Sequence, residues 1–314
     1  MADVRALAPV VALLVGACAT VRDAPPPQIA ITIDDLPVHG PFPPGVTAND
    51  VNAQMVDAIR SADVPGIFAF VNGERTQSQP ETRPSLGGWR SVGVVLANHG
   101  WAHRHLNEMS VAEFESELVA NENLLAGLGS GTNWRWFRYP FLDEGETPDK
   151  RAAARAVLAK HGYRVAAVTM DFSDWQWTAP YARCMAAKDK AAVAELERMY
   201  LDSAREHVDA SREVARKLHG RDIPYVQLMH VSAMSARMMP RLLQLYRDMG
   251  FRFVSLPQAQ RDPAYRAYTD LSHPAPPSVW ELAAQKGVRL PQPRDYSAKL
   301  AAMCAGSGPA VPTQ

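Results

Sequence analysis

The sequence predicts an α/β fold built on a mainly parallel sheet. Apolar runs of strand length alternate with helical patterns through most of the chain, which is typical of parallel strands joined by crossover helices. Seven such runs are present, and seven strands would close a barrel. The predicted strands are 29–33, 66–71, 92–97, 136–138, 163–168, 224–229 and 251–255.

The helices between these strands carry end signals. Thr47 is placed to open one helix, and Ser110 with Glu113 is the pattern of a capping box. Thr147 followed by Pro148 puts proline at the first helical position, where its missing N–H costs nothing. Three glycines follow helical stretches and precede strands, as expected of residues that end helices: Gly162, Gly220 and Gly250.

Two segments exceed a minimal strand and helix alternation. Residues 188–218 form a long, charged, Ala-rich helical pattern, and we interpret about 185–220 as a helical insertion in a barrel that spans 29–256. The remainder, 257–314, is a Pro-rich C-terminal extension. It contains one clear helix at 278–286, opened by Ser278 with Glu281 and ended by Gly287, which we expect to pack on the outside of the barrel.

The N-terminus, 1–17, has the pattern of an export signal: Arg5, then an apolar stretch too short to span a bilayer, then small residues. Its end, Leu14-Val-Gly-Ala-Cys18, resembles the lipobox of bacterial lipoproteins and predicts lipidation of Cys18. The alternative is an ordinary signal with an incidental cysteine. Residues 18–28 then form a tether, and the protein is expected in the cell envelope, lipid-anchored and facing the periplasm.

Charge limits the classes of binding partner, and the cysteine content predicts a disulfide. Lys plus Arg equals Asp plus Glu at 33 each, so the chain has no electrostatic footprint for nucleic acid, and membrane contact is expected through the lipid anchor only. With Cys18 acylated, Cys184 and Cys304 are left in an oxidising compartment, which predicts a disulfide between them. The alternative is two unrelated reduced thiols.

Two adjacent carboxylates, Asp34 and Asp35, end the first apolar run. Like charges so close raise each other's pKa, and burial penalises the ionised form, so something must compensate, and the favoured agent is a metal ion. A bound dication can take one carboxylate as a ligand and leave the other to act as a base. The alternative for this dipeptide alone is a solvated turn after a strand.

Two histidines four residues apart, His99 and His103, follow a later strand. On one turn of helix this spacing presents both imidazoles to one point, whereas His105 would face away. Together with the aspartates they complete an Asp/His/His set that leaves positions open for water and substrate, as catalytic zinc sites do. By itself, the histidine pair is equally compatible with a structural role.

Three further polar groups lie at the ends of predicted strands, where loops of a parallel barrel gather catalytic side chains. They are Arg138, the Asp171 to Asp174 segment and His230. Taken singly, each has an ordinary explanation as a surface ion pair, a helix cap or a core histidine. Their occurrence at successive strand ends favours a shared catalytic rim.

In this order the residues resemble the polysaccharide deacetylases, carbohydrate esterase family 4, with the NodB homology domain. The resemblance implies a distorted (β/α) barrel of about seven strands and extends to about residue 256. Five segments carry it: Thr32-Ile-Asp-Asp35, His99-x-x-x-His103, Arg138-Tyr-Pro140, Asp171-x-x-Asp-Trp175 and Leu228-Met-His230.

The resemblance also implies roles for these residues. Asp34 is the general base, positioned by Arg138, and His230 is the general acid, hydrogen-bonded to Asp174. The remaining roles are metal ligation by Asp35, His99 and His103, oxyanion stabilisation by the backbone N–H of Phe141, and an acetyl pocket shaped by Trp175 and Leu228.

Four positions depart from the family pattern. Ile33 stands where Phe is usual, and Gly100 where a Ser or Thr hydroxyl braces the histidine loop. Leu142 replaces a common Gly, and Val231 a frequent Asp. The ligands are kept, so these changes favour an altered rim and an unusual substrate.

The sequence therefore predicts a metal-dependent hydrolase that removes acetyl groups from an N- or O-acetylated envelope or extracellular polysaccharide. The cation is expected to be Zn²⁺, although Co²⁺ and Mn²⁺ share this ligand preference. Two alternatives stay open: a catalytically silent carbohydrate-binding lipoprotein, and a hydrolase of another linear amide on the same scaffold.

Overall fold

Seven parallel strands form one curled sheet in the computed structural model, which describes residues 25–128, 134–274 and 278–306. Every predicted strand has a counterpart, although three of them shrink to two residues. The strands are β1 (Gln28–Leu36), β2 (Phe68–Val71), β3 (Val95–Asn98), β4 (Trp136–Phe137), β5 (Arg164–Val165), β6 (Tyr225–His230) and β7 (Arg252–Phe253).

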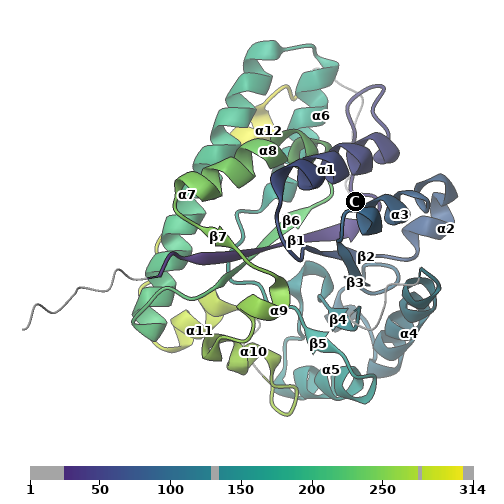
Figure 1. Cartoon of the computed structure of the whole chain (residues 1–314), viewed down its shortest axis with the longest axis vertical. Coiled ribbons are helices and arrows are strands. Elements are labelled where there is room, and N and C mark those ends of the chain that lie inside the picture. The colour runs from purple at the N-terminus through teal and green to yellow at the C-terminus, as the bar shows by residue number, and fades with distance from the viewer. Residues whose placement is uncertain (1–24, 129–133, 275–277, 307–314) are drawn as a thin grey trace, which may run out of the picture.

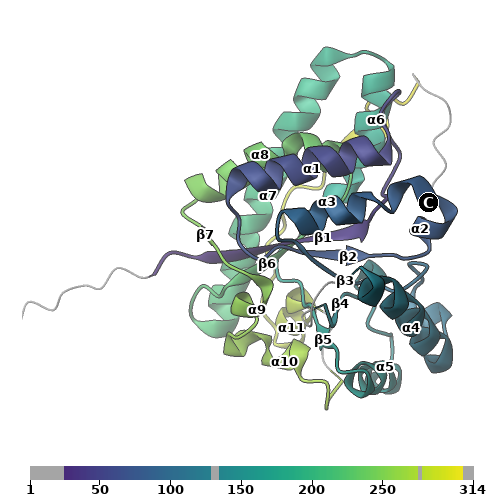
Figure 2. The same ribbon diagram turned by 45° about the vertical axis from the view of Figure 1, so that its right-hand side comes forward.

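Helices surround this sheet on both sides (Figure 1). In both views α1 and α8 lie on one side of β1, and α4 and α5 lie on the other (Figure 2). The helices are α1 (Ala48–Ala62), α2 (Arg75–Ser78), α3 (Ser85–Ser91), α4 (Val111–Gly127), α5 (Pro148–Lys160), α6 (Thr178–Ala186), α7 (Lys190–His219), α8 (Ala233–Asp248), α9 (Leu256–Ala259), α10 (Arg266–Thr269), α11 (Val279–Gln285) and α12 (Ser297–Ala302).

The predicted helix ends are present. Thr47 and Ser110 cap α1 and α4 through complete capping boxes, and the Thr147 side chain accepts the Lys150 N–H at the start of α5. The three glycines placed after helices all have positive φ, which a glycine adopts without a steric penalty.

The barrel is distorted and closes only in part. The strand order is β5-β4-β3-β2-β1-β6, with β7 paired to the first residues of β1. Between the edge strands β5 and β6 there is a single bridge, Met170 to Gln227, in place of a ladder. The expectation of seven strands closing a barrel is therefore correct for the fold class, but the seventh strand does not close the ring.

Strand β1 separates two environments. Ile29, Ile31 and Ile33 belong to the large core shared with the helices, as the alternation of side chains along a strand requires. Ala30 and Thr32 face the other way, toward the inside of the curled sheet. Because these two inward side chains are small, the inside of the sheet has room for the long, buried side chain of Arg138, the residue that follows β4.

The two aspartates lie within β1 and not beyond it, because β1 extends to Leu36. The register places Asp34 beside His230 of β6. The pairing with β2 then slips between Ile33 and Leu36, and Asp35 has a φ of 68°. This irregularity breaks the alternation of the strand, as bulges do, so that both carboxylates reach the same end of the sheet.

The predicted helical insertion is the long helix α7, which runs along nearly the full height of the molecule (Figure 1). The predicted extension helix is α11, capped by Ser278, and it packs on α7. Further on, Cys304 forms a disulfide with Cys184 of α6. The Arg183 guanidinium also donates to the Leu300 and Met303 carbonyl oxygens.

The predicted signal, lipobox and Cys18 lie outside the described residues and stay predictions. Within the described ranges, none of the helices has the length and apolar composition that a membrane crossing requires.

Replacing both Cys184 and Cys304 with alanine is expected to lower the free energy of unfolding by about 2–4 kcal/mol. The two cysteines are 120 residues apart, so the disulfide restricts a long loop of the unfolded chain. Chemical denaturation of the variant should match that of the reduced wild type, and a variant as stable as the oxidised wild type would contradict this expectation.

Candidate functional site

A cavity of about 430 Å³ opens at the carboxyl ends of the strands, and we call it the rim cavity. Its walls come from the ends of β1, β3 and β6 and from the loops after β4 and β5. They include most of the residues that the sequence singled out: Asp34, Asp35, His99, His103, Phe141, Trp175, Leu228 and His230.

Three of these residues form a tight cluster. The Nε2 atoms of His99 and His103 lie 3.3 and 3.2 Å from Oδ1 of Asp35. One potential ligand atom from each residue falls within 4.8 Å of the others. This is the Asp/His/His set that the sequence predicts.

The histidine pair reaches this geometry without a helix, which corrects the sequence prediction. Residues 99–103 form a loop after β3, in which Gly100 and His103 have φ angles of 74° and 52°. Two left-handed residues turn the chain back on itself, so both rings face Asp35. His105 lies outside the cluster, as expected, and its ring stacks on Phe141 with centroids 3.7 Å apart.

Buried asparagines brace this loop. Asn121 of α4 donates through Nδ2 to the Val71 carbonyl at 2.6 Å, to Oδ1 of Asn98 at 2.9 Å and to the Gly100 carbonyl at 3.1 Å. Asn72 donates to the His99 carbonyl at 2.7 Å. These amides hold the loop from outside, so Gly100 without a hydroxyl does not leave it unsupported.

The chemistry of the cluster fits a divalent cation. Nδ1 of His99 lies 2.8 Å from the Arg138 carbonyl oxygen, which assigns its proton to Nδ1 and leaves Nε2 as a lone pair. That lone pair faces Oδ1 of Asp35, a buried oxygen that accepts no hydrogen bond. Two such acceptors face each other favourably only around a cation, and carboxylate with imidazole is a donor set that suits Zn²⁺.

Asp35 is ionised in this environment. Burial opposes its ionisation, but the imidazoles of His103 and His39 hold its pKa well below the usual value. Nδ1 of His39 lies 2.6 Å from Oδ2, which leaves Oδ1 for the cluster.

Asp34 is paired with Arg138 inside the curled sheet. Nη1 of Arg138 lies 3.2 Å from Oδ2 of Asp34, and both side chains are almost fully buried. Nε donates to the Ala166 carbonyl at 2.7 Å, and Nη2 donates to the Thr32 hydroxyl at 3.1 Å. Burial lowers the pKa of Arg138 and the negative charge of Asp34 opposes that effect. The guanidinium is thus held on three sides, and it fixes the Asp34 carboxylate.

His230 is paired with Asp174. Its Nδ1 lies 2.6 Å from Oδ1 of Asp174, and its backbone N–H donates to Oδ2 at 2.9 Å. The Ser235 hydroxyl donates to the same Oδ2 at 2.6 Å. Burial lowers the pKa of His230, but Asp174, Asp35 and Asp34 outweigh it and raise the pKa to about 10.

Two aromatic side chains stand exposed at the rim cavity. Phe141 is 54 % exposed and Trp175 is 48 % exposed. Phe141 has a φ of 57°, and its ring lies 4.4 Å from that of His103. Leu228, in contrast, is buried within β6.

Four side chains at this site are not among the residues predicted from the sequence, namely His39, Asn72, Arg75 and Ser235, whereas Asp171 begins the predicted Asp171 to Asp174 segment. His39 follows Asp35 by four residues, a spacing that parallels His99 and His103 and was available as a signal. Asp171 lines the cavity, and burial raises its pKa. Asn72 and Arg75 also line it, but no local pattern marks them, because β2 and the turn after it bring them there. Ser235 is likewise placed by the fold alone.

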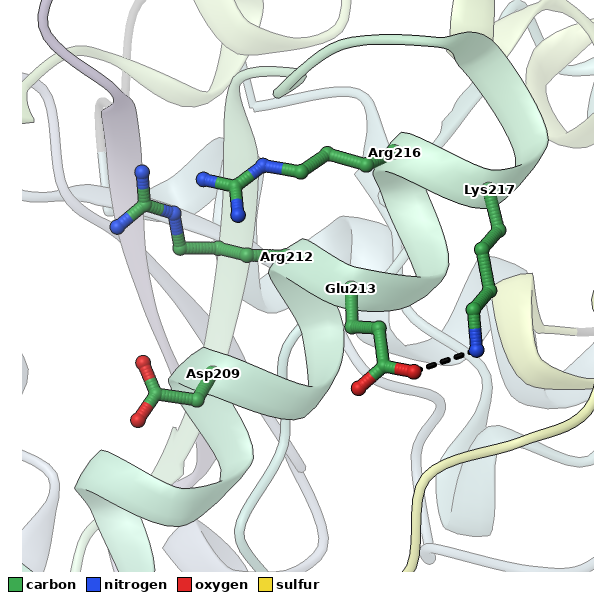
Figure 3. Close-up of a pocket in the computed structure, with 5 residues that line it drawn as sticks. All are labelled: Asp209, Arg212, Glu213, Arg216 and Lys217. Atoms are coloured by element: carbon green, nitrogen blue, oxygen red, sulfur yellow. Dashed lines mark hydrogen bonds and ion pairs between the residues drawn. The ribbon is translucent and has the colours of Figure 1, made fainter.

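A separate depression of about 440 Å³ lies on the outer face of α7 (Figure 3). The Arg212 and Arg216 side chains extend in the same direction there, and both donate to Asp222. Lys217 pairs with Glu213. Its cations are thus engaged with carboxylates of the same chain, so this surface is a network of ion pairs and not a catalytic centre.

An α/β barrel with an Asp/His/His cluster and two carboxylate pairs, Asp34–Arg138 and Asp174–His230, at its carboxyl rim is the arrangement expected of a hydrolase. Residues 21–166 match the family model described as polysaccharide deacetylase. This part of the chain, 146 of its 314 residues, is therefore similar to the polysaccharide deacetylase family.

Solved structures share this fold. The chitin deacetylase of Colletotrichum lindemuthianum matches with a TM-score of 0.51 and 19% identity, over 74% of this chain and 87% of its own. A family 4 carbohydrate esterase from Streptomyces lividans matches with 22% identity and a TM-score of 0.47, over 74% and 95%. A family 4 pseudoenzyme from Bacillus anthracis matches with 13% identity and a TM-score of 0.50, over 75% and 66%.

Replacing Asn121 with leucine is expected to lower the free energy of unfolding by about 1–3 kcal/mol, because the buried acceptors at Val71, Asn98 and Gly100 each lose one of their two donors. Denaturant unfolding measures this loss. Val119→Ala on the exposed part of α4 is the control, and equal effects of the two changes would contradict the bracing role.

The stability of the cation-free protein is expected to fall as the pH rises from about 6.5 to about 10. The pKa of His230 is raised to about 10 in the folded state, so its stabilising contribution is complete below the unfolded value and is lost above it. The difference in unfolding free energy between wild type and His230→Gln should shrink over this range. A constant difference would show that His230 is neutral throughout.

Proposed function

We propose that the protein is a metal-dependent hydrolase that removes acetyl groups from an N- or O-acetylated polysaccharide of the cell envelope. The observation that carries this proposal is the presence of three elements in one cavity: the Asp35, His99 and His103 cluster, the Asp34–Arg138 pair and the Asp174–His230 pair. Export and lipid anchoring through Cys18 belong to the same proposal and rest on the sequence pattern.

Asp35, His99 and His103 would hold the cation, most suitably Zn²⁺, with Co²⁺ or Mn²⁺ as alternatives. When bound, a dication acts as a Lewis acid that polarises the acyl group and acidifies water.

The chain's own residues would carry the protons. Asp34 lies 3.7 Å from Nε2 of His99 and therefore beside the cluster, where it would accept the proton of the attacking water. Arg138 would orient the Asp34 carboxylate for this step. Because the pKa of His230 is raised, its imidazole is protonated at neutral pH and would donate to the leaving nitrogen or oxygen.

Walls of the rim cavity would bind the substrate. The exposed rings of Phe141 and Trp175 offer apolar faces of the kind on which the C–H face of a sugar packs. Trp175 and Leu228 would enclose the acetyl methyl group, and the Phe141 N–H would donate to the developing oxyanion.

The silent carbohydrate-binding alternative is disfavoured by the two acid–base pairs, since binding alone requires neither a base nor an acid. Hydrolysis of another linear amide uses the same machinery and differs only in the substrate. An assay of acetate release from peptidoglycan, chitin-type oligomers, exopolysaccharide and acetylated xylan, with and without a chelator, separates these possibilities.

Two substitutions test the division of labour between the aspartates. Asp34→Asn is expected to keep the cation and to lower kcat by about 10²–10⁴-fold, because a general base contributes this much. Asp35→Asn is expected to weaken cation binding, measured by metal titration of the purified protein, because the cluster loses its only anionic ligand.

Asp149→Asn, an exposed change on α5, serves as the control for both substitutions. Equal loss of cation from Asp34→Asn and Asp35→Asn would refute the assignment of roles. Unchanged acetate release by Asp34→Asn would refute the proposed reaction.

A further inference from the structure

A second cavity, of about 290 Å³, adjoins the rim cavity and has no part in the reaction proposed above. Leu142 and Asp171 line both cavities, so the second begins where the rim cavity ends. Its other walls come from the loop 168–171, from His207 of α7, from Trp280 of α11 and from the segment 290–293. All four of these walls lie outside the residues that match the family model.

The outer wall of this cavity is tied to α7 on both sides. The Arg289 carbonyl accepts a hydrogen bond from Lys217 at 3.2 Å, and the Arg294 N–H donates to Glu206 at 2.9 Å. Residues 290–293 span the distance between these two ties. Farther along the chain, the Cys184–Cys304 disulfide joins the end of the extension to α6. The wall is therefore a fixed part of the fold.

The lining combines apolar faces with a few polar groups. Trp280, Pro291 and Pro293 present flat or rigid apolar surfaces, whereas Asp171 and His207 present hydrogen-bonding atoms. Nδ1 of His207 lies 2.8 Å from the Ser203 carbonyl, which assigns the proton to Nδ1 and leaves Nε2 as an acceptor. A mostly apolar pocket with few convergent polar groups suits a small ligand, and one sugar ring has both a C–H face and hydroxyls to match.

The junction of the two cavities contains a strained residue. Leu142 has a φ of 55°, a conformation that glycine adopts freely and that other residues adopt at a cost. Its side chain is half-buried and lines both cavities. Leu142 is therefore an apolar contact at the junction of the two cavities. A saccharide chain that extended from the rim cavity into the second cavity would pass this residue.

We propose that the second cavity is a sugar subsite, which holds the unit of the substrate chain adjacent to the acylated unit in the rim cavity. This inference rests on the proposed function. It specifies that the substrate is an oligomer and that the protein also binds the sugar next to the reacting one. Trp280 would be the stacking residue of the subsite, and Asp171 and His207 would contact hydroxyls.

The test compares N-acetylated glucosamine oligomers of one to four units. For wild type, kcat/KM for acetate release is expected to rise with length, and Trp280→Ala is expected to lose about tenfold on the longer oligomers with little change on the monomer. Trp280→Phe should recover most of the loss. Leu282→Ala on the same helix is the matched control, because Leu282 packs against the neighbouring apolar core but does not line the cavity.

Calorimetric titration of the tetramer into Asp34→Asn gives a readout without turnover, and adding Trp280→Ala should weaken binding by a similar factor. Equal losses on all lengths, or no loss, would overturn the subsite and leave the proposed function intact. Failure to release acetate from any saccharide would overturn the proposed function, and the titration then decides the subsite by itself.

Discussion

Two adjacent carboxylates buried at the end of a central strand are the constraint on which this structure depends. Two unpaired buried charges would be strongly unfavourable, so each carboxylate must have its own compensation. Asp34 obtains it from Arg138 within the sheet, and Asp35 obtains it from His39 and His103 at the rim. The slip in register after Ile33 directs both to one cavity while keeping these partners separate.

This constraint explains features of the barrel far from the rim. Arg138 can reach Asp34 only because the inward positions of β1 carry the small side chains of Ala30 and Thr32. The Arg138 guanidinium also donates to a backbone carbonyl and a hydroxyl, so a small polar network lies beside the apolar side chains that fill the rest of the sheet's interior. The histidine loop is likewise held by buried hydrogen bonds, which come from the amides of Asn72, Asn98 and Asn121.

Much of this arrangement was predictable from the sequence. Strands and caps follow local rules, so alternation and the residues at Thr47, Ser110 and Thr147 were sufficient to locate them. The conformation of the histidine loop was not predictable. A helical turn would bring the two imidazoles together, and so does the actual loop, in which Gly100 and His103 are left-handed, so the spacing fits both conformations. The roles of Asn121 and Ser235 were not predictable, because only contacts between segments far apart in the sequence bring them to the site.

The pairing of β1 with β6 has a consequence for how the activity is distributed along the chain. The residues that match the family model, 21–166, include the cluster, Asp34 and Arg138, whereas Asp174 and His230 come later. Asp34 and His230 are register partners in neighbouring strands. Pairing of β1 with β6 therefore also brings the proposed base and the proposed acid together, and neither half of the sequence contains both of them.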